Sequence, residues 1–213
     1  MLDYPTDKIL DTKFIKVYDM HFKENGHYYD ASRRTLEDLL ANQSAEEIIK
    51  MVPDAVSCSV VLEPEGQEPL LLLAYEYRYP IGQFLLSPTA GLIDEEDKVM
   101  SPEKAVRVTA IRELKEETGI TFREGDEVEI ISPMLFSSPG MTDENNAMAR
   151  VTIHNADLSE LNQGGCEGSE RFDGFKLLNV DEAKRILEQG YDDGGMFYSV
   201  YTWIALADFV MRH

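Results

Sequence analysis

Cysteine is scarce in this chain: Cys58 and Cys166 are its only two thiols, and they lie in unrelated sequence contexts. Two scattered thiols are typical of a protein in the reducing cytoplasm. Cys166 lies in the acidic segment GGCEGSE, which lacks the positive environment that a catalytic thiol needs. We therefore expect both cysteines to be structural, and the composition argues against thiol chemistry.

Long apolar runs are also missing from the sequence. The longest strongly apolar stretch, Leu70–Ala74, is far shorter than the roughly 18 residues that a membrane-spanning helix needs. The first ten residues, MLDYPTDKIL, have neither the basic start nor the apolar core of a signal peptide. The sequence therefore predicts a cytoplasmic protein with no membrane partner.

Positive charge is in short supply, with 20 lysines and arginines against 40 aspartates and glutamates and a formal net charge of -20. A protein of that composition would not neutralise the phosphates of a nucleic acid polymer or the head groups of an anionic membrane, so we expect neither as a partner. Small anions are not excluded, because a divalent metal ion can bridge acidic side chains to phosphate. The remaining composition, 43% apolar and 28% charged, is globular, and 213 residues suit one domain with or without an extension.

Strand and helix patterns mix along the chain in an α/β or α+β order. A turn at 24–27 joins two expected strands, and Ser44 is expected to cap the second of two short helices within 35–51. The last expected helix is apolar nearly all round, which predicts burial in the core or at a subunit interface. The expected strands are 14–22, 27–31, 55–62, 70–77, 84–86, 127–131, 147–153 and 175–178, and the longer expected helices are 101–117, 181–190 and 197–211.

The most informative segment is RELKEETGI, from Arg112 to Ile120. On a helix, Glu113, Glu116 and Glu117 share one face, where their mutual repulsion favours a solvated surface or a bound cation such as Mg²⁺ or Mn²⁺. Arg112 could orient one of these glutamates through a bidentate pair. Two glutamates on a helix are nearly always a solvated face, but the complete string should arise by chance on the order of once in a thousand such chains.

This string resembles the core of the Nudix box, whose family pattern is G-x5-E-x7-R-E-U-x-E-E-x-G-U with U apolar. Gly91 opens the pattern here, but Asp97 stands where the upstream glutamate is expected. Fourteen residues rather than seven separate Asp97 from Arg112, so the loop and the helix start are lengthened, and Glu103 is a second candidate for the upstream acid. The resemblance implies an α/β (α+β) fold, a Nudix-type α/β/α sandwich with a mixed β-sheet.

Two flanking segments resemble the ADP-ribose pyrophosphatase subfamily. They are EYRYP followed by AGLID, within 76–94, and SPGMTDE, 138–144. Thr89 replaces the family's proline, and Ser87 or Pro88 replaces a glutamate. The resemblance covers 12–34 and 55–210, with 35–51 as an insertion. It implies two regions in a homodimer. Residues 1–54 would form an N-terminal β-hairpin extension and a helical insertion, which serve dimerisation and substrate contact. Residues 55–213 would form the Nudix hydrolase domain.

The resemblance also implies a mechanism, the Mg²⁺-dependent hydrolysis of ADP-ribose to AMP and ribose 5-phosphate. Metal ions would be held by Glu113 and Glu117, assisted by Glu116 and the carbonyl of Ala90, with Arg112 beside them. Water would then attack one phosphorus in line. A carboxylate outside the box would serve as general base, and Glu170, Glu144 and Glu167 all remain candidates.

Substrate contacts are expected from cations and aromatic rings. Arg78 is the first candidate for the phosphates or the ribose, because a planar guanidinium suits such oxygens. Arg33 and Arg34 follow a strand that, by resemblance, reaches the adenine, and Tyr29 could stack on the base. The alternatives are ordinary strand packing for Tyr28 and Tyr29, a surface pair for Arg33 and Arg34, and a structural ion pair for Arg78. His27 and His154 are expected to be polar strand or surface residues.

Two further functions remain open. The altered SPTAG segment and the longer box are compatible with a different diphosphate, such as a sugar nucleotide, NADH or a dinucleotide. A Nudix-fold nucleotide sensor without catalysis is the other alternative, but a domain that only binds has no chemical need for three clustered glutamates.

Overall fold

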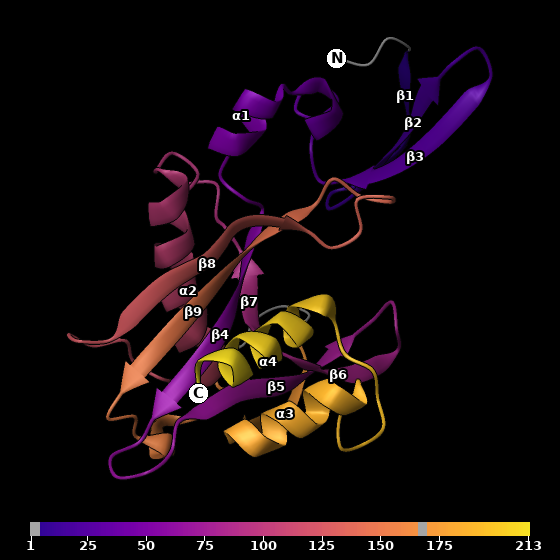
Figure 1. Cartoon of the computed structure of the whole chain (residues 1–213). Coiled ribbons are helices and arrows are strands. Elements are labelled where there is room, and N and C mark those ends of the chain that lie inside the picture. The colour runs from indigo at the N-terminus through magenta and orange to yellow at the C-terminus, as the bar shows by residue number, and fades with distance from the viewer. Residues whose placement is uncertain (1–4, 166–169) are drawn as a thin grey trace.

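The computed structural model describes residues 5–165 and 170–213, and these residues form two β-sheets and their covering helices (Figure 1). The larger sheet has the strand order β10-β5-β4-β9-β8, with β6 paired to β5 and β7 to β4. Strands β4 and β9 are parallel and the other pairs are antiparallel, so the sheet is mixed. Its strands are β4 (Ala55–Glu63), β5 (Leu70–Arg78), β6 (Gln83–Ser87), β7 (Thr89–Leu92), β8 (Glu127–Phe136), β9 (Asn145–His154) and β10 (Phe172–Leu178).

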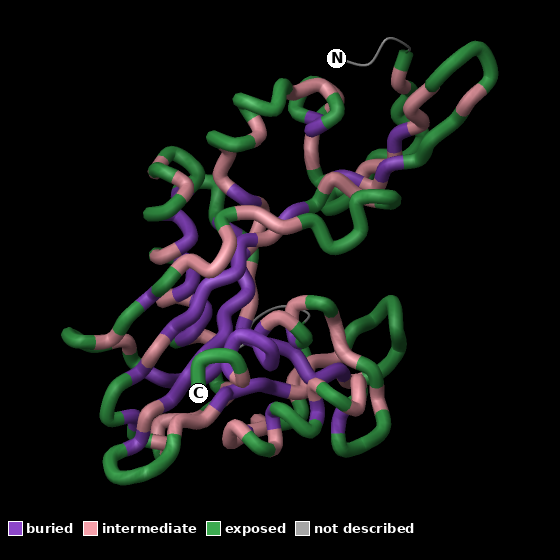
Figure 2. Tube along the Cα trace, viewed as in Figure 1, coloured by how far each residue is buried: buried purple, intermediate pink, exposed green. Residues whose placement is uncertain are grey.

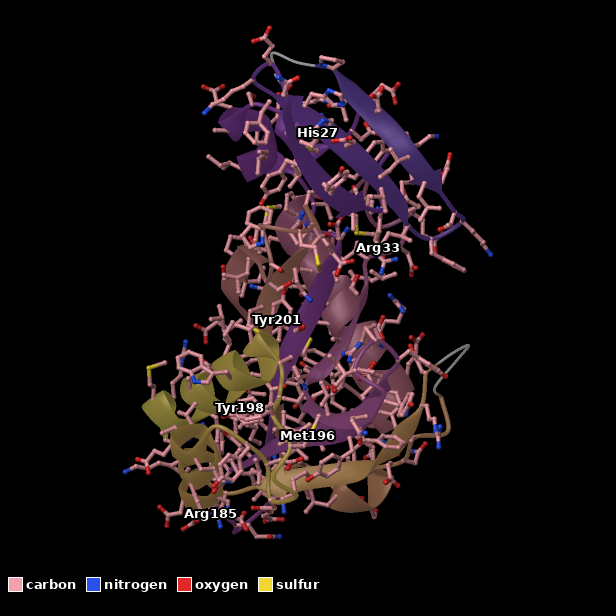
Figure 3. The ribbon with its side chains drawn as sticks, turned by 90° about the vertical axis from the view of Figure 1, so that its right-hand side faces the viewer. His27, Arg33, Arg185, Met196, Tyr198 and Tyr201 are labelled. Atoms are coloured by element: carbon pink, nitrogen blue, oxygen red, sulfur yellow. The ribbon has the colours of Figure 1, made fainter. Side chains whose placement is uncertain are left out.

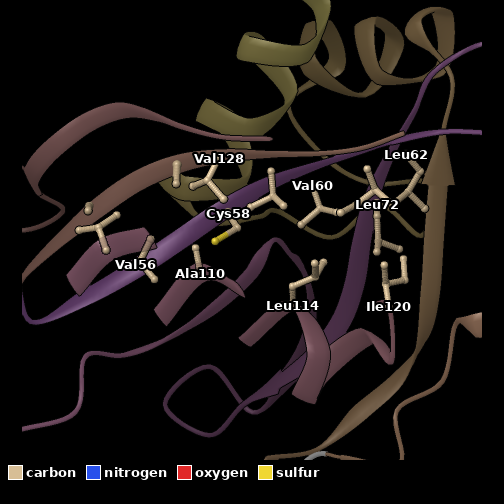
Figure 4. Packing of buried hydrophobic residues seen from close by; sticks show 14 of the residues in the cluster. Val56, Cys58, Val60, Leu62, Leu72, Ala110, Leu114, Ile120 and Val128 are labelled. Carbon is tan, nitrogen blue, oxygen red and sulfur yellow. The ribbon is translucent and has the colours of Figure 1, made fainter. Parts of the chain in front are cut away.

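Helices cover both faces of this sheet, which confirms the predicted α/β/α sandwich. Helix α2 (Pro102–Thr118) lies on one face, and α3 (Val180–Gln189) and α4 (Val200–Arg212) lie on the other (Figure 1). Strand side chains alternate between the two layers, as a pleated sheet buried on both faces requires. Val60 and Leu72 pack with α2 (Figure 4). Val61 packs with α3 and α4 on the opposite face.

The N-terminal residues form a separate three-stranded antiparallel sheet, which projects from the body and is largely exposed (Figures 1 and 2). It contains the expected hairpin, β2 (Lys16–Phe22) and β3 (Gly26–Ser32), and one additional strand, β1 (Thr6–Asp11). Strand β1 was missed because five of its six residues are exposed, so its sequence carries no apolar alternation. Pairing with β2 alone holds it in place.

The 35–51 segment contains less helix than expected. A 3-10 turn, η1 (Leu40–Asn42), precedes the short helix α1 (Ala45–Lys50). The cap at Ser44 is confirmed: its hydroxyl accepts the Glu47 N–H, and the Glu47 carboxylate accepts the Ser44 N–H. The sequence between 51 and 55 then leads into β4.

Several boundaries differ from the sequence expectations for local reasons. Strand β7 is formed by residues after Pro88 for which no strand was predicted, and it pairs with β4 from Ala55 to Cys58. Strand β8 extends to Phe136 through two register shifts. Helix α3 begins at Val180 rather than at residue 181, because Asn179 caps it by accepting the Glu182 N–H.

Helix α4 is buried on one face only. Its inward residues include Leu206 and Phe209, whereas Trp203 is 51% exposed and Met211 is 79% exposed. The apolar character on all sides therefore does not correspond to complete burial within one chain. Among the described residues, no helix is long and apolar enough to cross a membrane.

Candidate metal and active site

Helix α2 presents the clustered glutamates because its ends are defined by local signals. Ser101 precedes Pro102 at the first helical position, and Gly119 ends the helix with a φ of 75°, in the left-handed region that glycine adopts without strain. The Lys115 ammonium donates to the carbonyl of Gly119 at 2.7 Å, which satisfies one group at this terminus. The helix therefore places Glu113 and Glu117 one turn apart on the face toward β7.

Glu113 and Glu117 are each only 5% exposed. Burial, together with the charges of Glu116 and Glu170, raises the pKa of Glu113 to about 7, although Arg112 opposes that shift. Burial also raises the pKa of Glu117 well above its usual value, and the neighbouring charges of Glu113, Glu76 and Glu170 add to the effect. Two buried carboxylates that repel each other are costly unless a cation compensates them. This donor set fits a hard divalent ion.

Strand β7 lies directly against these carboxylates. The N–H of Ala90 donates to Glu117 Oε2 at 3.3 Å. A Cβ atom built on Gly91 would lie 1.7 Å from Glu113 Oε1, so only glycine leaves room for this carboxylate. The glycine that opens the box therefore has a direct steric role, and the Ala90 backbone lies beside Glu117.

We expect Gly91→Ala to reduce kcat/KM on the order of 10²-fold for ADP-ribose, the substrate that the resemblance implies. A displacement of about 1 Å at a reacting centre can cost that much. Its Cβ must displace the Glu113 carboxylate. Gly140→Ala is the matched control, since its Cβ would meet only the Tyr28 hydroxyl, at 3.4 Å. Steady-state kinetics on the two variants test the claim, and equal activities would contradict it.

Arg112 contacts two glutamates of its own helix and the end of β7, whereas the sequence suggested a bidentate pair with one glutamate. One guanidinium nitrogen, Nη1, lies 2.9 Å from a carboxylate oxygen of Glu113 and 2.9 Å from one of Glu116. The other, Nη2, donates to the carbonyl of Leu92 at 2.9 Å and lies 3.3 Å from Asp94. This single side chain therefore positions two glutamates relative to the end of β7.

Glu76 is a member of the acidic cluster that the sequence reasoning missed. Its side chain is 16% exposed on β5, and burial raises its pKa, with Arg78 opposing and Glu170 adding to the shift. Strand pairing brings Glu76 close to the segment of Glu170. Phe172 of β10 lies opposite Glu76, and the Tyr77 N–H donates to the carbonyl of Arg171 at 2.8 Å. The sequence signal that could have identified Glu76 is a single acidic residue near the end of an apolar strand.

The candidate general bases are separated in the structure. Glu170 precedes β10 and its charge acts on Glu76, Glu113 and Glu117. Glu144 instead accepts a hydrogen bond from Arg33 Nε at 2.8 Å. Glu167 lies outside the described residues, as does Cys166.

The candidate substrate residues occupy different environments. Arg78 is 44% exposed and lies 2.5 Å from Glu76, so it borders the acidic cluster. Arg34 is 9% exposed and bridges Asp54, at 2.7 Å, and Asp143, at 3.4 Å. The alternative considered for Arg34 was a surface pair, whereas the structure shows a buried one. Tyr29 is 55% exposed on β3.

The two candidates for the upstream acid also differ. Glu103 pairs with Arg107 at 3.0 Å. It precedes Glu113 by ten helical residues, which corresponds to about 15 Å along the axis. Asp97 is buried in the turn before α2 and its N–H donates to the carbonyl of Asp94. Glu103 is therefore not a neighbour of the glutamate pair.

Two cavities lie between the N-terminal sheet and the body. One of about 550 Å³ is lined by Lys13, Arg33 and Lys98 together with Leu92 at the end of β7. Figure 3 shows Arg33 at this junction, below the N-terminal sheet. A second, apolar cavity of about 260 Å³ is lined by Tyr28 and Asp30 of β3.

Asp30 lines the apolar cavity and is 6% exposed, with Oδ2 lacking a hydrogen-bond partner among the described residues. Burial and the charge of Asp143 raise its pKa to about 6. A raised carboxyl pKa means that its contribution to stability is present below the unfolded value of 3.8 and is lost as the pH rises through 6.

We therefore expect Asp30→Asn to stabilise the protein at pH 8 by about 2 kcal/mol. The gain should shrink below pH 6 and vanish near pH 4, while the amide oxygen still accepts the Asp143 N–H. Urea unfolding at pH 8, 6 and 4 measures this dependence. A pH-independent effect, or a loss of stability at pH 8, would show that the charge is not the cause.

Comparison with known proteins gives the class to which this fold and site belong. A family model described as the NUDIX domain matches residues 51–197, which is more than half of the chain. The chain therefore belongs to the Nudix family, whose members generally use divalent metal ions and act on small nucleotide derivatives.

Two relatives match at modest identity. The ADP-sugar pyrophosphatase of Mus musculus is 33% identical over 108 residues, which cover 51% of this chain and 44% of that protein. An uncharacterised Nudix hydrolase of Schizosaccharomyces pombe is 33% identical over 107 residues, covering 50% of this chain and 45% of that protein. The matched region thus spans less than half the length of these relatives.

Proposed function

We propose that this chain hydrolyses the diphosphate bond of a nucleoside diphosphate derivative, with ADP-ribose as the first candidate and AMP and ribose 5-phosphate as products. The observation that carries the proposal is the buried pair Glu113 and Glu117 against the backbone of Ala90 and Gly91. The 33% identity to an ADP-sugar pyrophosphatase supports the substrate class.

The chain's own residues divide the chemical work. Glu113 and Glu117, with Glu116 and the Ala90 carbonyl, would hold Mg²⁺ or Mn²⁺, which neutralises diphosphate charge and lowers the pKa of bound water. Arg112 keeps Glu113 and Glu116 in place through its two contacts of 2.9 Å. Glu170 accepts the proton of the attacking water. The new bond joins the water oxygen to one phosphorus as the bridging oxygen leaves with the other phosphate.

Arg78 is proposed to bind the phosphates or the ribose. Its guanidinium is partly exposed beside Glu76 and borders the acidic cluster. We expect Arg78→Ala to raise KM for ADP-ribose about 5-fold to 10-fold with a smaller effect on kcat, because one lost hydrogen bond costs about 1 to 1.5 kcal/mol. An unchanged KM would remove Arg78 from the site. Arg185→Ala is the control, since Arg185 pairs with Asp193 at 2.7 Å, before α4.

The remaining parts of the proposal concern assembly and location. We propose a homodimer in which the N-terminal sheet and the outer face of α4 meet a second copy, because Trp203 and Val200 are exposed apolar residues. Light scattering at several concentrations tests the dimer, and a monomer throughout would contradict it. A cytoplasmic location is supported by Cys58, a free and fully buried thiol.

A substrate panel decides between the proposed substrates and between catalysis and sensing. Wild type and Glu117→Gln would be incubated with ADP-ribose, a sugar nucleotide, NADH and a dinucleotide in the presence of Mg²⁺. Faster release of nucleoside monophosphate from ADP-ribose by wild type alone is the expected result. If wild type hydrolyses no member faster than the variant, catalysis is excluded and a nucleotide sensor becomes the better interpretation.

A further inference from the structure

Two histidines and two aspartates converge on one face of the N-terminal sheet. His21 of β2 lies opposite His27 of β3, and Asp7 of β1 lies opposite Asp19 of β2. Directly paired residues, and residues two apart on one strand, point to the same side of a sheet. All four side chains therefore share one face, and they come from all three strands.

The polar atoms of this group are close together. His27 Nδ1 lies 2.9 Å from Asp19 Oδ2, and His21 Nε2 lies 3.8 Å from the same oxygen. One ligand atom from each of these three residues lies within 4.8 Å of the other two. Asp7 adds an oxygen 3.2 Å from His21 Nε2.

These separations are close to those that a tetrahedral metal ion requires. Bonds of about 2.0 to 2.1 Å at tetrahedral angles separate neighbouring ligand atoms by roughly 3.3 Å. The ring of His27 is 48% exposed and that of His21 is 29% exposed, so both rings have room to adjust. Their centroids are 4.7 Å apart. Small side-chain rotations therefore suffice to form the ligand set.

The charge balance of this face also favours a cation. Among the described residues, neither Asp7 nor Asp19 forms an ion pair with lysine or arginine. Asp19 is 13% exposed and both imidazoles contact it. The whole chain carries a net charge of -20, which adds a favourable long-range field.

The group is distinct from the cavities and from the glutamates of α2. Met20, Tyr28 and Asp30, which alternate with the group along β2 and β3, line the apolar cavity on the opposite face. Figure 3 shows His27 in the N-terminal sheet, well separated from Arg33 at the junction with the body. Imidazole nitrogen prefers Zn²⁺ and similar transition metals, whereas an all-carboxylate cluster suits Mg²⁺. The two sites therefore differ in metal preference.

We propose that Asp19, His21 and His27 bind a divalent transition metal ion, with Zn²⁺ as the first candidate and Asp7 as its fourth ligand. The ion joins β1 to the β2–β3 hairpin. Five of the six β1 residues are exposed and the strand pairs with β2 alone, so it has little apolar packing to hold it. A small sheet of this kind gains order from a cross-strand ligand set.

The test is a titration of the metal-free, full-length protein with Zn²⁺, followed by calorimetry and by hydrogen exchange of residues 6–32. It is run in wild type and in Glu117→Gln, because Zn²⁺ also binds carboxylates. We expect one equivalent that persists in Glu117→Gln and slows exchange across β1, β2 and β3. The double variant His21→Gln/His27→Gln should bind Zn²⁺ at least 10-fold more weakly, by analogy with the cost of disturbing a metal site.

His154→Gln is the matched control. His154 Nδ1 lies 2.7 Å from Glu63, so this pair has the same imidazole–carboxylate contact as His27 and Asp19. Among the described residues, no second imidazole joins the pair. Its Zn²⁺ affinity and exchange protection should equal those of wild type. Asp7→Asn should weaken binding less and lose protection mainly in β1. If the double variant misfolds, the single variant His27→Gln gives the same comparison. It should fold, because the ring of His27 is 48% exposed.

Two results would overturn the proposal. One is a Glu117→Gln protein, with both histidines intact, that binds no Zn²⁺. The other is a histidine variant with the same affinity and the same protection as His154→Gln. Neither result bears on diphosphate hydrolysis, so the two proposals fail independently.

Discussion

Replacing Glu117 with glutamine is expected to lower kcat/KM for the best substrate by about 10³-fold or more, because it removes a metal ligand that supplies several kcal/mol of charge stabilisation. The same change should stabilise the metal-free protein at pH 8. Burial and neighbouring carboxylates raise the pKa of Glu117, so its charged form is costly in the folded state. The amide oxygen still accepts the Ala90 N–H.

The pH dependence of that stabilisation has a defined sign. A carboxyl with a raised pKa contributes stability below its usual value of 4.5, and this contribution is lost as the pH rises through the folded value. The advantage of Glu117→Gln should therefore be present at pH 8 and absent below pH 4.5. Chelator-treated protein unfolded by urea at both pH values gives the measurement.

Two observations would contradict this interpretation of Glu117. One is activity within a few-fold of wild type, and the other is a loss of stability at pH 8. Glu116→Gln is the comparison within the same helix face. Its carboxylate is 44% exposed and held by Arg112, so we expect only about a 10-fold loss of activity, since a solvated charge contributes less than a buried one.

The second large effect is expected at Glu170. Glu170→Gln should reduce kcat by about 10³-fold, within the range of 10² to 10⁴ that a general base contributes. Glu144→Gln should cost much less, because Glu144 is held by Arg33 at 2.8 Å, whereas the charge of Glu170 acts directly on Glu113 and Glu117. The pH dependence of kcat separates the roles, since loss of the base should remove the acidic limb.

The reverse order of effects would assign the base to Glu144. Equal, small losses in both variants would make Glu167 the next candidate for the general base, to be tested with Glu167→Gln. Far-ultraviolet circular dichroism and metal affinity serve as controls, because a general base outside the helix should leave both nearly unchanged.

The parts of the site that lie within one helix were predictable. The positions of Glu113, Glu116 and Glu117 follow from the helical period, and the ends of α2 follow from Pro102 and Gly119. These signals are local, so they do not depend on the rest of the fold. The sheet covered on both faces, by contrast, was expected from the resemblance to the Nudix box.

The membership of the wider acidic cluster was not predictable from such signals. Glu76 lies nearly 100 residues before Glu170 in sequence, and only the antiparallel pairing of β5 with β10 brings their segments together. Arg34 was expected at the substrate, but burial between Asp54 and Asp143 depends on how the 138–144 loop folds over the N-terminal sheet. Burial and long-range pairing are properties of the assembled chain.

The order of the amino acids is enough to give the helical spacing of the carboxylates, the caps that place them and the family of the chain. Three features depend on packing in three dimensions: which acids are buried, the need for glycine at Gly91 beside Glu113, and the meeting of His21 and His27 across a hairpin. The difference lies in the distance along the chain over which each effect acts. Local periodicity acts over a few residues, whereas desolvation and steric contact arise only when distant segments pack together.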